Sequence, residues 1–111
     1  MRAPSLCLSA ALVLALPAPG TAVDAQAGRK LVAAKCQVCH GIDGIAKIPM
    51  APHLAGESDI YLRAQLKAFR SGERKHEMMS VVAKELSDDD IANAAAWYSS
   101  IQITATVPSD P

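Results

Sequence analysis

Residues 36–40 read C-Q-V-C-H, and this pentapeptide directs the interpretation of the rest of the chain. It presents the thiols of Cys36 and Cys39 and the imidazole of His40 at the spacing that attaches a c-type haem. In such a site the two thiols form thioethers with the haem vinyl groups, and the adjacent His is an axial ligand of the iron. The pentapeptide therefore predicts one covalently bound haem c, held by Cys36 and Cys39 and ligated by His40.

Two other kinds of site use a C-x-x-C pair. A structural zinc site needs a second pair of ligands, and a thioredoxin-like redox pair needs a flanking strand within a βαβ pattern. The sequence around Cys36 and Cys39 has neither context, whereas a His follows the second Cys directly and Gly41 follows the His. Haem attachment is therefore the favoured interpretation.

The start of the chain has the features of a secretory signal peptide. Met1 and Arg2 form a short positive region, and residues 6–16 form an apolar run that is too short to span a bilayer comfortably. Prolines and a glycine interrupt this run within 17–20, and residues 23–25 have the small-x-small form of a cleavage site. These features predict a protein that is exported to the periplasm.

The position of cleavage defines the domains. We expect cleavage after Ala25, with cleavage after Ala22 as the second choice and an uncleaved signal anchor as the alternative. Residues 1–25 are then the signal peptide and residues 26–111 the mature domain, which we expect not to be bound to a membrane. Cys7 is removed with the signal peptide, so the mature chain keeps the two cysteines of the pentapeptide.

The composition is that of a small globular domain with few aromatic residues. Aromatic side chains make up 4% of the chain, and a domain of this size is near the lower limit that an apolar core alone stabilises. A covalently held haem would contribute a large apolar surface around which short helices can pack. The formal net charge is zero, and no aromatic stacking groups alternate with basic ones, so we expect no nucleic-acid partner.

The pattern of helix formers and breakers predicts an all-α domain. We expect helices over 27–35, from 58 to 71–72, and from 87 to about 101, with an irregular loop over 41–52 and a loose tail over 102–111. Ser87 should cap the last helix in a capping box with Asp90. The second helix carries an apolar stripe of Tyr61, Leu62, Leu66 and Phe69, opposite a basic face of Arg63, Lys67 and Arg70.

An iron that only transfers electrons needs a second axial ligand. The candidates downstream of the pentapeptide are methionines and histidines, and composition alone does not choose among Met50, Met78, Met79, His53 and His76.

Longer stretches of the chain resemble a known family. C-Q-V-C-H-G-I-D-G at 36–44, P-H-L-A-G at 52–56, Y-L-R-A-Q-L-K-A-F-R-S-G at 61–72, M-M at 78–79 and L-S-D-D-D-I at 86–91 are similar to the small class I cytochromes c of the bacterial periplasm. The resemblance is greatest to the cytochrome c(553) and single-haem cytochrome c-four type. It implies the class I cytochrome c fold, in which short helices pack around one covalently attached haem c.

The resemblance also implies roles for individual residues. In that family the axial Met lies seven residues before the Leu of the Leu-Ser that opens the last helix, which indicates Met79 and leaves Met78 as an apolar neighbour. Pro52 matches the proline whose backbone carbonyl accepts a hydrogen bond from the axial His. Gly28 and Trp97 match the small residue and the aromatic at the crossing of the first and last helices.

Each remaining candidate could have a purely structural role or a functional one. His53 and His76 are interpreted as surface residues, because both lie among polar or charged neighbours. Trp97 and Tyr98 are interpreted as core packing. Tyr61 has two open interpretations, core packing or a hydrogen bond to a haem propionate.

We therefore expect a periplasmic one-electron carrier with His/Met ligation and no enzymatic activity of its own. Its partners would be redox proteins: a periplasmic dehydrogenase, a membrane cytochrome complex or a terminal oxidase. Two alternatives stay open, a cytochrome subunit of a flavocytochrome-like dehydrogenase complex, and a peroxidase or small-ligand sensor with a labile Met. The basic residues within 63–75 are either a solvated helix face or a docking surface for a partner.

Overall fold

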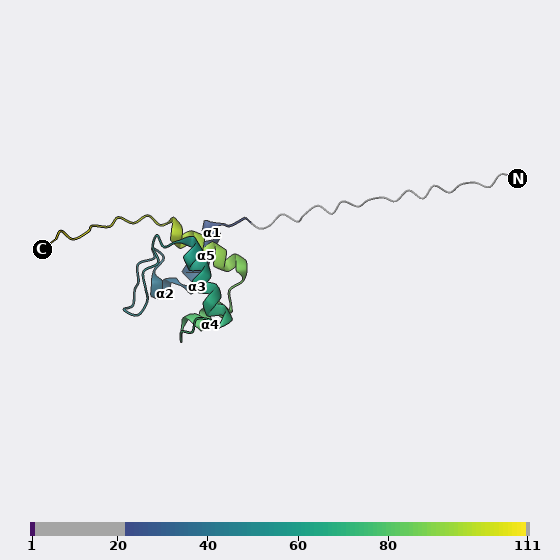
Figure 1. Cartoon of the computed structure of the whole chain (residues 1–111), viewed down its shortest axis with the longest axis horizontal. Helices are drawn as coiled ribbons and strands as arrows, with labels where there is room; N and C mark the ends of the chain where they lie inside the picture. Colours follow the sequence, from purple (N-terminus) through teal and green to yellow (C-terminus); the bar gives the residue numbers. More distant parts are fainter. Residues whose placement is uncertain (2–21, 111) are drawn as a thin grey trace.

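The computed structural model describes Met1 and residues 22–110, so the predicted signal peptide lies almost entirely outside the described residues. The described part contains no strand, and its helices are α1 Ala25–Lys35, α2 Gln37–His40, α3 Asp59–Ser71, α4 Met79–Lys84 and α5 Asp88–Ser100 (Figure 1). None of the helices in this part is long and apolar enough to cross a membrane. The all-α prediction is confirmed.

The crossing of α1 and α5 forms the centre of the domain. A Cβ atom added at Gly28 would lie 1.9 Å from the backbone oxygen of Asn93 and 3.1 Å from Cβ of Trp97, so the two backbones approach as closely as glycine permits. The crossing predicted at Gly28 and Trp97 is therefore confirmed. Val32 of α1, Leu62 of α3 and residues of α5 then form one buried cluster.

Helix α1 begins two residues earlier than the sequence suggests. The Asp24 carboxylate accepts from the backbone N–H of Gln26 at 2.8 Å, and the backbone N–H of Asp24 donates to Oδ1 of Asn93 at 2.8 Å. Asp24 is therefore both the N-cap of α1 and a link to α5.

The other predicted helix ends agree with the structure. Oγ of Ser58 accepts from the backbone N–H of Tyr61 at 3.3 Å, and α3 ends at Gly72, whose φ of 85° is left-handed. Ser87 and Asp90 form the predicted capping box of α5, with both hydrogen bonds at 3.0 Å. Residues 102–110 have no regular structure and run away from the helices (Figure 1), as expected for a tail.

The side chain of Arg70 does not lie on a solvated basic face, as one of the two interpretations had it. Its guanidinium donates to the backbone oxygen of Leu86 at 3.0 Å and to the carboxylate of Asp88. The long side chain reaches across from α3 because the start of α5 offers it a carbonyl and a carboxylate. Arg70 therefore links α3 to the start of α5 rather than pointing into solvent.

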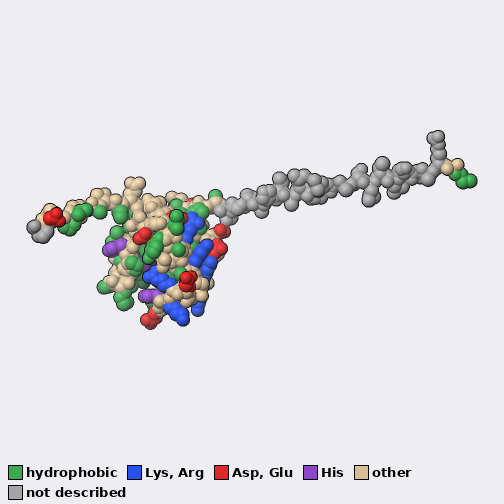
Figure 2. Space-filling view, in the orientation of Figure 1, with side chains coloured by type: hydrophobic (Ala, Val, Ile, Leu, Met, Phe, Trp, Pro, Cys, Tyr) green, Lys and Arg blue, Asp and Glu red, His purple; other side chains and the backbone are tan. Residues whose placement is uncertain are grey.

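Charged and apolar side chains gather on different parts of the visible surface. Lys and Arg side chains lie mainly on the right-hand and lower parts of the domain in this view, whereas hydrophobic side chains lie on the left, over the loop between α2 and α3 (Figure 2). This loop begins directly after the pentapeptide, at Gly41.

Candidate functional site

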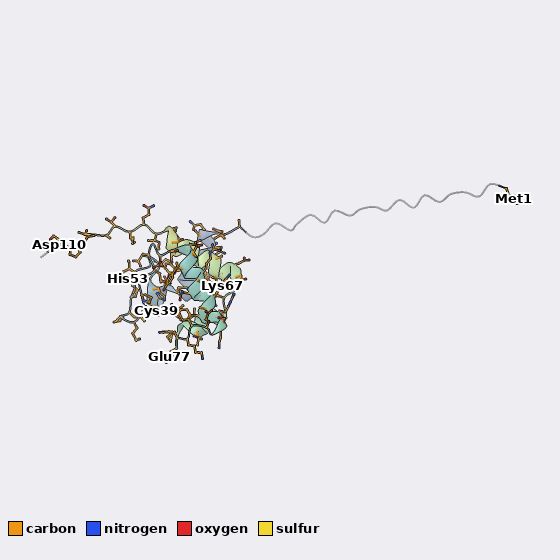
Figure 3. All side chains as sticks on the ribbon, viewed as in Figure 1. Met1, Cys39, His53, Lys67, Glu77 and Asp110 are labelled. Carbon is orange, nitrogen blue, oxygen red and sulfur yellow. The ribbon has the colours of Figure 1, made fainter. Side chains whose placement is uncertain are left out.

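The pentapeptide forms one tight turn at the end of α1. Cys36 is the C-cap of α1, and the backbone N–H groups of Cys39 and His40 both donate to its carbonyl oxygen, at 3.3 and 3.0 Å. Neither thiol is in a disulfide. The short helix α2 therefore presents two free thiols and an imidazole within a single turn, and Cys39 lies on the same side of the domain as His53 (Figure 3).

The His40 ring is buried and oriented. His40 is 8% exposed. Nδ1 of its ring lies 3.0 Å from the backbone oxygen of Pro52, which is the contact expected from the resemblance. Because a carbonyl oxygen only accepts, Nδ1 carries the proton and Nε2 keeps its lone pair. An imidazole held in this way is prepared to bind a metal through Nε2.

Two aromatic side chains of α5 hold the backbone that follows His40. Nε1 of Trp97 donates to the backbone oxygen of Ile42 at 2.8 Å, and the hydroxyl of Tyr98 donates to the backbone oxygen of Gly41 at 3.0 Å. Tyr98 is 3% exposed, and burial raises the pKa of its hydroxyl, so it stays a donor. Core packing was the role expected of both residues, and these hydrogen bonds were not predicted. The available signal was that buried Trp and Tyr need a partner for their polar atoms.

Gly41 allows the chain to turn sharply behind His40. Its φ is 76°, and a Cβ there would lie 2.5 Å from the backbone oxygen of Ile45. The next segment then returns to the pentapeptide, where the backbone N–H of Lys47 donates to the carbonyl oxygen of Cys39 at 2.8 Å. The loop over 41–52 is therefore irregular, as predicted, and it is fixed to the site at several points.

The environment of Cys36 does not suit thiol redox chemistry. Burial raises its pKa from 9.0 to about 11, and the charge of Lys35 lowers it only in part. Reactive or metal-binding cysteines have a lowered pKa, because the thiolate is the active form. The raised pKa of Cys36 therefore argues against a thioredoxin-like use of the C-x-x-C pair.

The methionine candidates differ in exposure. Met50 is 83% exposed and Met78 is 59% exposed, whereas Met79, the first residue of α4, is partly buried. The expectation that Met78 is an apolar neighbour in the haem pocket stays a prediction, because its exposed side chain is available for such a contact. His53 and His76 are exposed, as predicted.

The residues present fit a covalently bound haem. Two free thiols, an oriented imidazole and a partly buried thioether supply the attachment and ligation chemistry, on Cys36, Cys39, His40 and Met79. Exposed apolar side chains also occur on α2, in the following loop, in the first turn of α3 and near the start of α4, namely Val38, Ile45, Met50, Ile60, Tyr61, Met78 and Val81.

Comparison with known proteins agrees with this fit. The sequence profile of the cytochrome c family, described as Cytochrome c, matches residues 25–102. Cytochrome c-554(548) of Halomonas halodenitrificans is 45% identical over 80 residues, which cover 69% of this chain and 95% of that protein.

Two solved structures are also similar. Reduced recombinant cytochrome c4 from Pseudomonas stutzeri has a TM-score of 0.66 and 38% identity, covering 73% of this chain and 47% of that chain. The thiosulfate dehydrogenase TsdBA from Marichromatium purpuratum has a TM-score of 0.64 and 36% identity, covering 78% of this chain and 21% of that chain. This chain thus spans about half of the cytochrome c4 chain, and nearly all of the Halomonas protein.

The matched region contains the pentapeptide, its supporting loop and the helices that hold both. The predicted fold class and family agree with the profile and with the structural neighbours. The chain belongs to the cytochrome c family, as an electron-transfer protein of the cytochrome c4 type that carries a covalently bound haem c.

Proposed function

We propose that this chain is a periplasmic one-electron carrier in which His40 and Met79 are the two axial ligands of the haem iron. The observation that carries the proposal is the buried imidazole of His40, which is oriented by Pro52 and lies within one helical turn of two free thiols. When bound, the haem supplies the redox chemistry, the exchange of one electron between ferric and ferrous iron.

Each residue of the site has a distinct task in this proposal. Cys36 and Cys39 hold the haem through thioether bonds, so that it is not lost when the chain meets a partner. By accepting from Nδ1, Pro52 raises the basicity of His40 and fixes the plane of its ring. The Met79 thioether is a soft, weak donor that favours the reduced state, which raises the potential relative to ligation by two histidines.

Tyr61 is proposed as a contact for a haem propionate. It lies in the first turn of α3 and is 49% exposed, so it does not serve mainly as core packing. An exposed phenol is free to donate to a carboxylate.

The periplasmic location rests on the N-terminal segment. Of the two predicted cleavage positions, cleavage after Ala25 would remove Asp24, which caps α1 and binds Asn93. Cleavage after Ala22 would keep both contacts. We therefore favour the second choice, and mass spectrometry of the exported protein would distinguish a chain that begins at Val23 from one that begins at Gln26.

A dehydrogenase is the proposed source of electrons. The likeness to thiosulfate dehydrogenase TsdBA supports a second candidate function, that of the electron-accepting subunit of such an enzyme. Electrons would then pass on to a membrane cytochrome complex or a terminal oxidase. Stoichiometric co-purification with a dehydrogenase would favour the dedicated subunit over the free carrier.

The basic face of α3 offers a limited docking surface. Arg63 forms an ion pair with Asp59 at 2.8 Å. The pKa of Asp88 lies below its ordinary value, mainly because Arg70 donates a hydrogen bond to it and also because of the charges of Arg70 and Lys67. These basic charges are therefore partly neutralised within the domain. Lys67→Glu should slow association with an acidic partner only at low ionic strength, because salt screens such a contribution beyond about 10 Å at 0.1 M.

The axial ligation has a direct test. Met79→Ala should abolish the sulfur-to-iron charge-transfer band of the ferric protein and lower its reduction potential, whereas Met78→Ala should preserve both. A band that survives the loss of Met79 and disappears with Met78 would place the ligand one residue earlier. A band that responds to neither variant would refute ligation by this Met pair.

The carrier proposal is tested against the peroxidase or ligand-sensor alternative by carbon monoxide. With both axial positions occupied, the reduced protein at neutral pH should bind carbon monoxide poorly and show negligible peroxidase turnover. Ready binding of carbon monoxide by the wild-type protein would favour the alternative with a labile Met.

A further inference from the structure

Helix α4 lacks the usual features that start a helix. It has six residues, Met79–Lys84, with no acidic residue in its first turn, and the residue at its N-cap position, Met78, forms no side-chain cap. A helix this short is not stable by itself in water. The first N–H groups of α4 therefore need an acceptor from elsewhere.

His76 supplies that acceptor. Nδ1 of its imidazole lies 3.2 Å from the backbone nitrogen of Met78 and 3.3 Å from that of Met79. Because both backbone groups donate, Nδ1 is the acceptor and the proton of the neutral ring is on Nε2. A side chain that accepts from the second and third residues after it is the geometry of an N-cap, although His is not a usual residue for that role.

Neighbouring groups hold the His76 ring and backbone in place. The ring meets the buried ring of Phe69 edge-on, with centroids 6.3 Å apart and planes at 72°. The backbone N–H of His76 donates to Oγ of Ser80, and the backbone N–H of Ser80 donates to the carbonyl oxygen of His76, both at 3.0 Å. His76 and Ser80 thus close the first turn around Met79 from both ends.

We propose that His76 is a positioning residue for the axial ligand: its imidazole caps α4 through the backbone N–H groups of Met78 and Met79 and so holds the Met79 sulfur toward the iron. This role rests on the proposed ligation by Met79. It assigns a structural role to a histidine that is exposed and that is interpreted from the sequence as a surface residue.

The cap should strengthen the proposed bond between the Met79 sulfur and the haem iron, and not only the stability of the fold. In this proposal, release of Met79 moves the first turn of α4, and the cap resists that movement. A small ligand that competes for the iron, such as imidazole, therefore measures how firmly the cap holds the sulfur, because its apparent affinity includes the free energy of displacing Met79.

The experiment compares His76→Ala, His76→Asn and Ser87→Ala in the ferric holoprotein, with imidazole binding followed by loss of the charge-transfer band. Asn keeps an acceptor suited to an N-cap, whereas Ala does not. His76→Ala should bind imidazole about fivefold more tightly than wild type, the factor that corresponds to about 1 kcal/mol, and His76→Asn should recover most of the wild-type affinity. Ser87→Ala removes the cap of α5 instead and should lower thermal stability without changing imidazole binding.

The outcomes separate this role from the ligation itself. A wild-type ferric protein without the charge-transfer band would refute ligation by Met79, and the role of His76 with it. If wild type has the band, equal imidazole affinity in wild type and His76→Ala would overturn the positioning role alone. The positioning role is likewise overturned if His76→Asn behaves like His76→Ala, or if Ser87→Ala changes imidazole affinity as much as His76→Ala does.

Discussion

The two sides of the site are built differently. On the His40 side, the pentapeptide and its loop are held by groups far away in the sequence, including the carbonyl of Pro52 and the polar atoms of Trp97 and Tyr98. On the Met79 side, the hydrogen bonds that shape the first turn of α4 come from within four residues, from His76 and the residues that follow it.

Under the proposed ligation by His40 and Met79, this difference predicts which axial bond gives way first. Contacts between distant parts of the chain break only when the helices separate, whereas local contacts can open within one segment. An exposed ion pair between Lys35 and Glu85, at 2.9 Å, links the end of α1 to the end of α4. Because an exposed ion pair contributes little, the Met79 side should still respond to local changes that leave the His40 side intact.

The largest effect is expected from breaking the covalent attachment on the His40 side. Cys36→Ala or Cys39→Ala leaves at most one thioether, so the yield of holoprotein should fall sharply. Acid-acetone extraction should leave the haem on the wild-type protein, because thioether bonds survive it. Haem that is extracted from wild type, or a full yield of holoprotein from either variant, would contradict the predicted attachment.

A large loss of stability is expected from the scaffold behind the His40 side. Gly28→Ala would place a Cβ 1.9 Å from the backbone oxygen of Asn93, so α1 and α5 must move apart at a cost of about 1–3 kcal/mol. Thermal unfolding of the holoprotein measures this loss. Ala34→Ser, on the exposed part of α1, is the control and should change the stability by no more than about 0.5 kcal/mol.

A smaller effect is expected from Tyr98→Phe. The change leaves the carbonyl of Gly41 without its partner and should lower the free energy of unfolding by about 1–2 kcal/mol, as measured by denaturant unfolding. Because Tyr98 supports the His40 side, imidazole should displace Met79 from this variant no more easily than from wild type. Easier displacement would show that the two sides are not independent.

The smallest effect is expected from Glu85→Gln, which breaks the ion pair between the two sides. The hydrogen bond and charge of Lys35 hold the pKa of Glu85 below its ordinary value of 4.5, so the folded state gains stability from the ionised carboxylate. That gain is present above pH 4.5 and is lost as the pH falls through the lower folded-state pKa. Thermal unfolding as a function of pH should therefore show a small difference between wild type and variant near neutrality that disappears in acid, and a difference that persists in acid would exclude the ion pair as its cause.

Local signals in the sequence predicted most of the helices. The N-cap at Ser58, the left-handed Gly72 and the capping box of Ser87 and Asp90 all occur where they were expected. Such signals are readable because each depends on residues within a few positions of one another. The start of α1 was placed too late because the cap at Asp24 lies inside the segment predicted as a cleavage site.

The chemistry of the site was also present in the sequence. The spacing of Cys36, Cys39 and His40 is a covalent requirement of haem attachment and needs no tertiary structure to be recognised. The family profile agrees with this prediction. The roles of individual residues beyond the pentapeptide, Met79 among them, remain proposals with the tests given above.

What the sequence alone determined was therefore the cofactor, the fold class and the ends of α3 and α5, because these depend on short-range spacing. Only the tertiary structure decided which groups support the site. The bonds from Trp97 and Tyr98 to the loop, the link from Arg70 to the start of α5, and the low burial of Met78 all depend on how α3, α4 and α5 pack. Polar side chains bind the partners that lie near them in space, and residues that lie 16 to 57 positions apart carry no local sequence pattern that predicts the pairing.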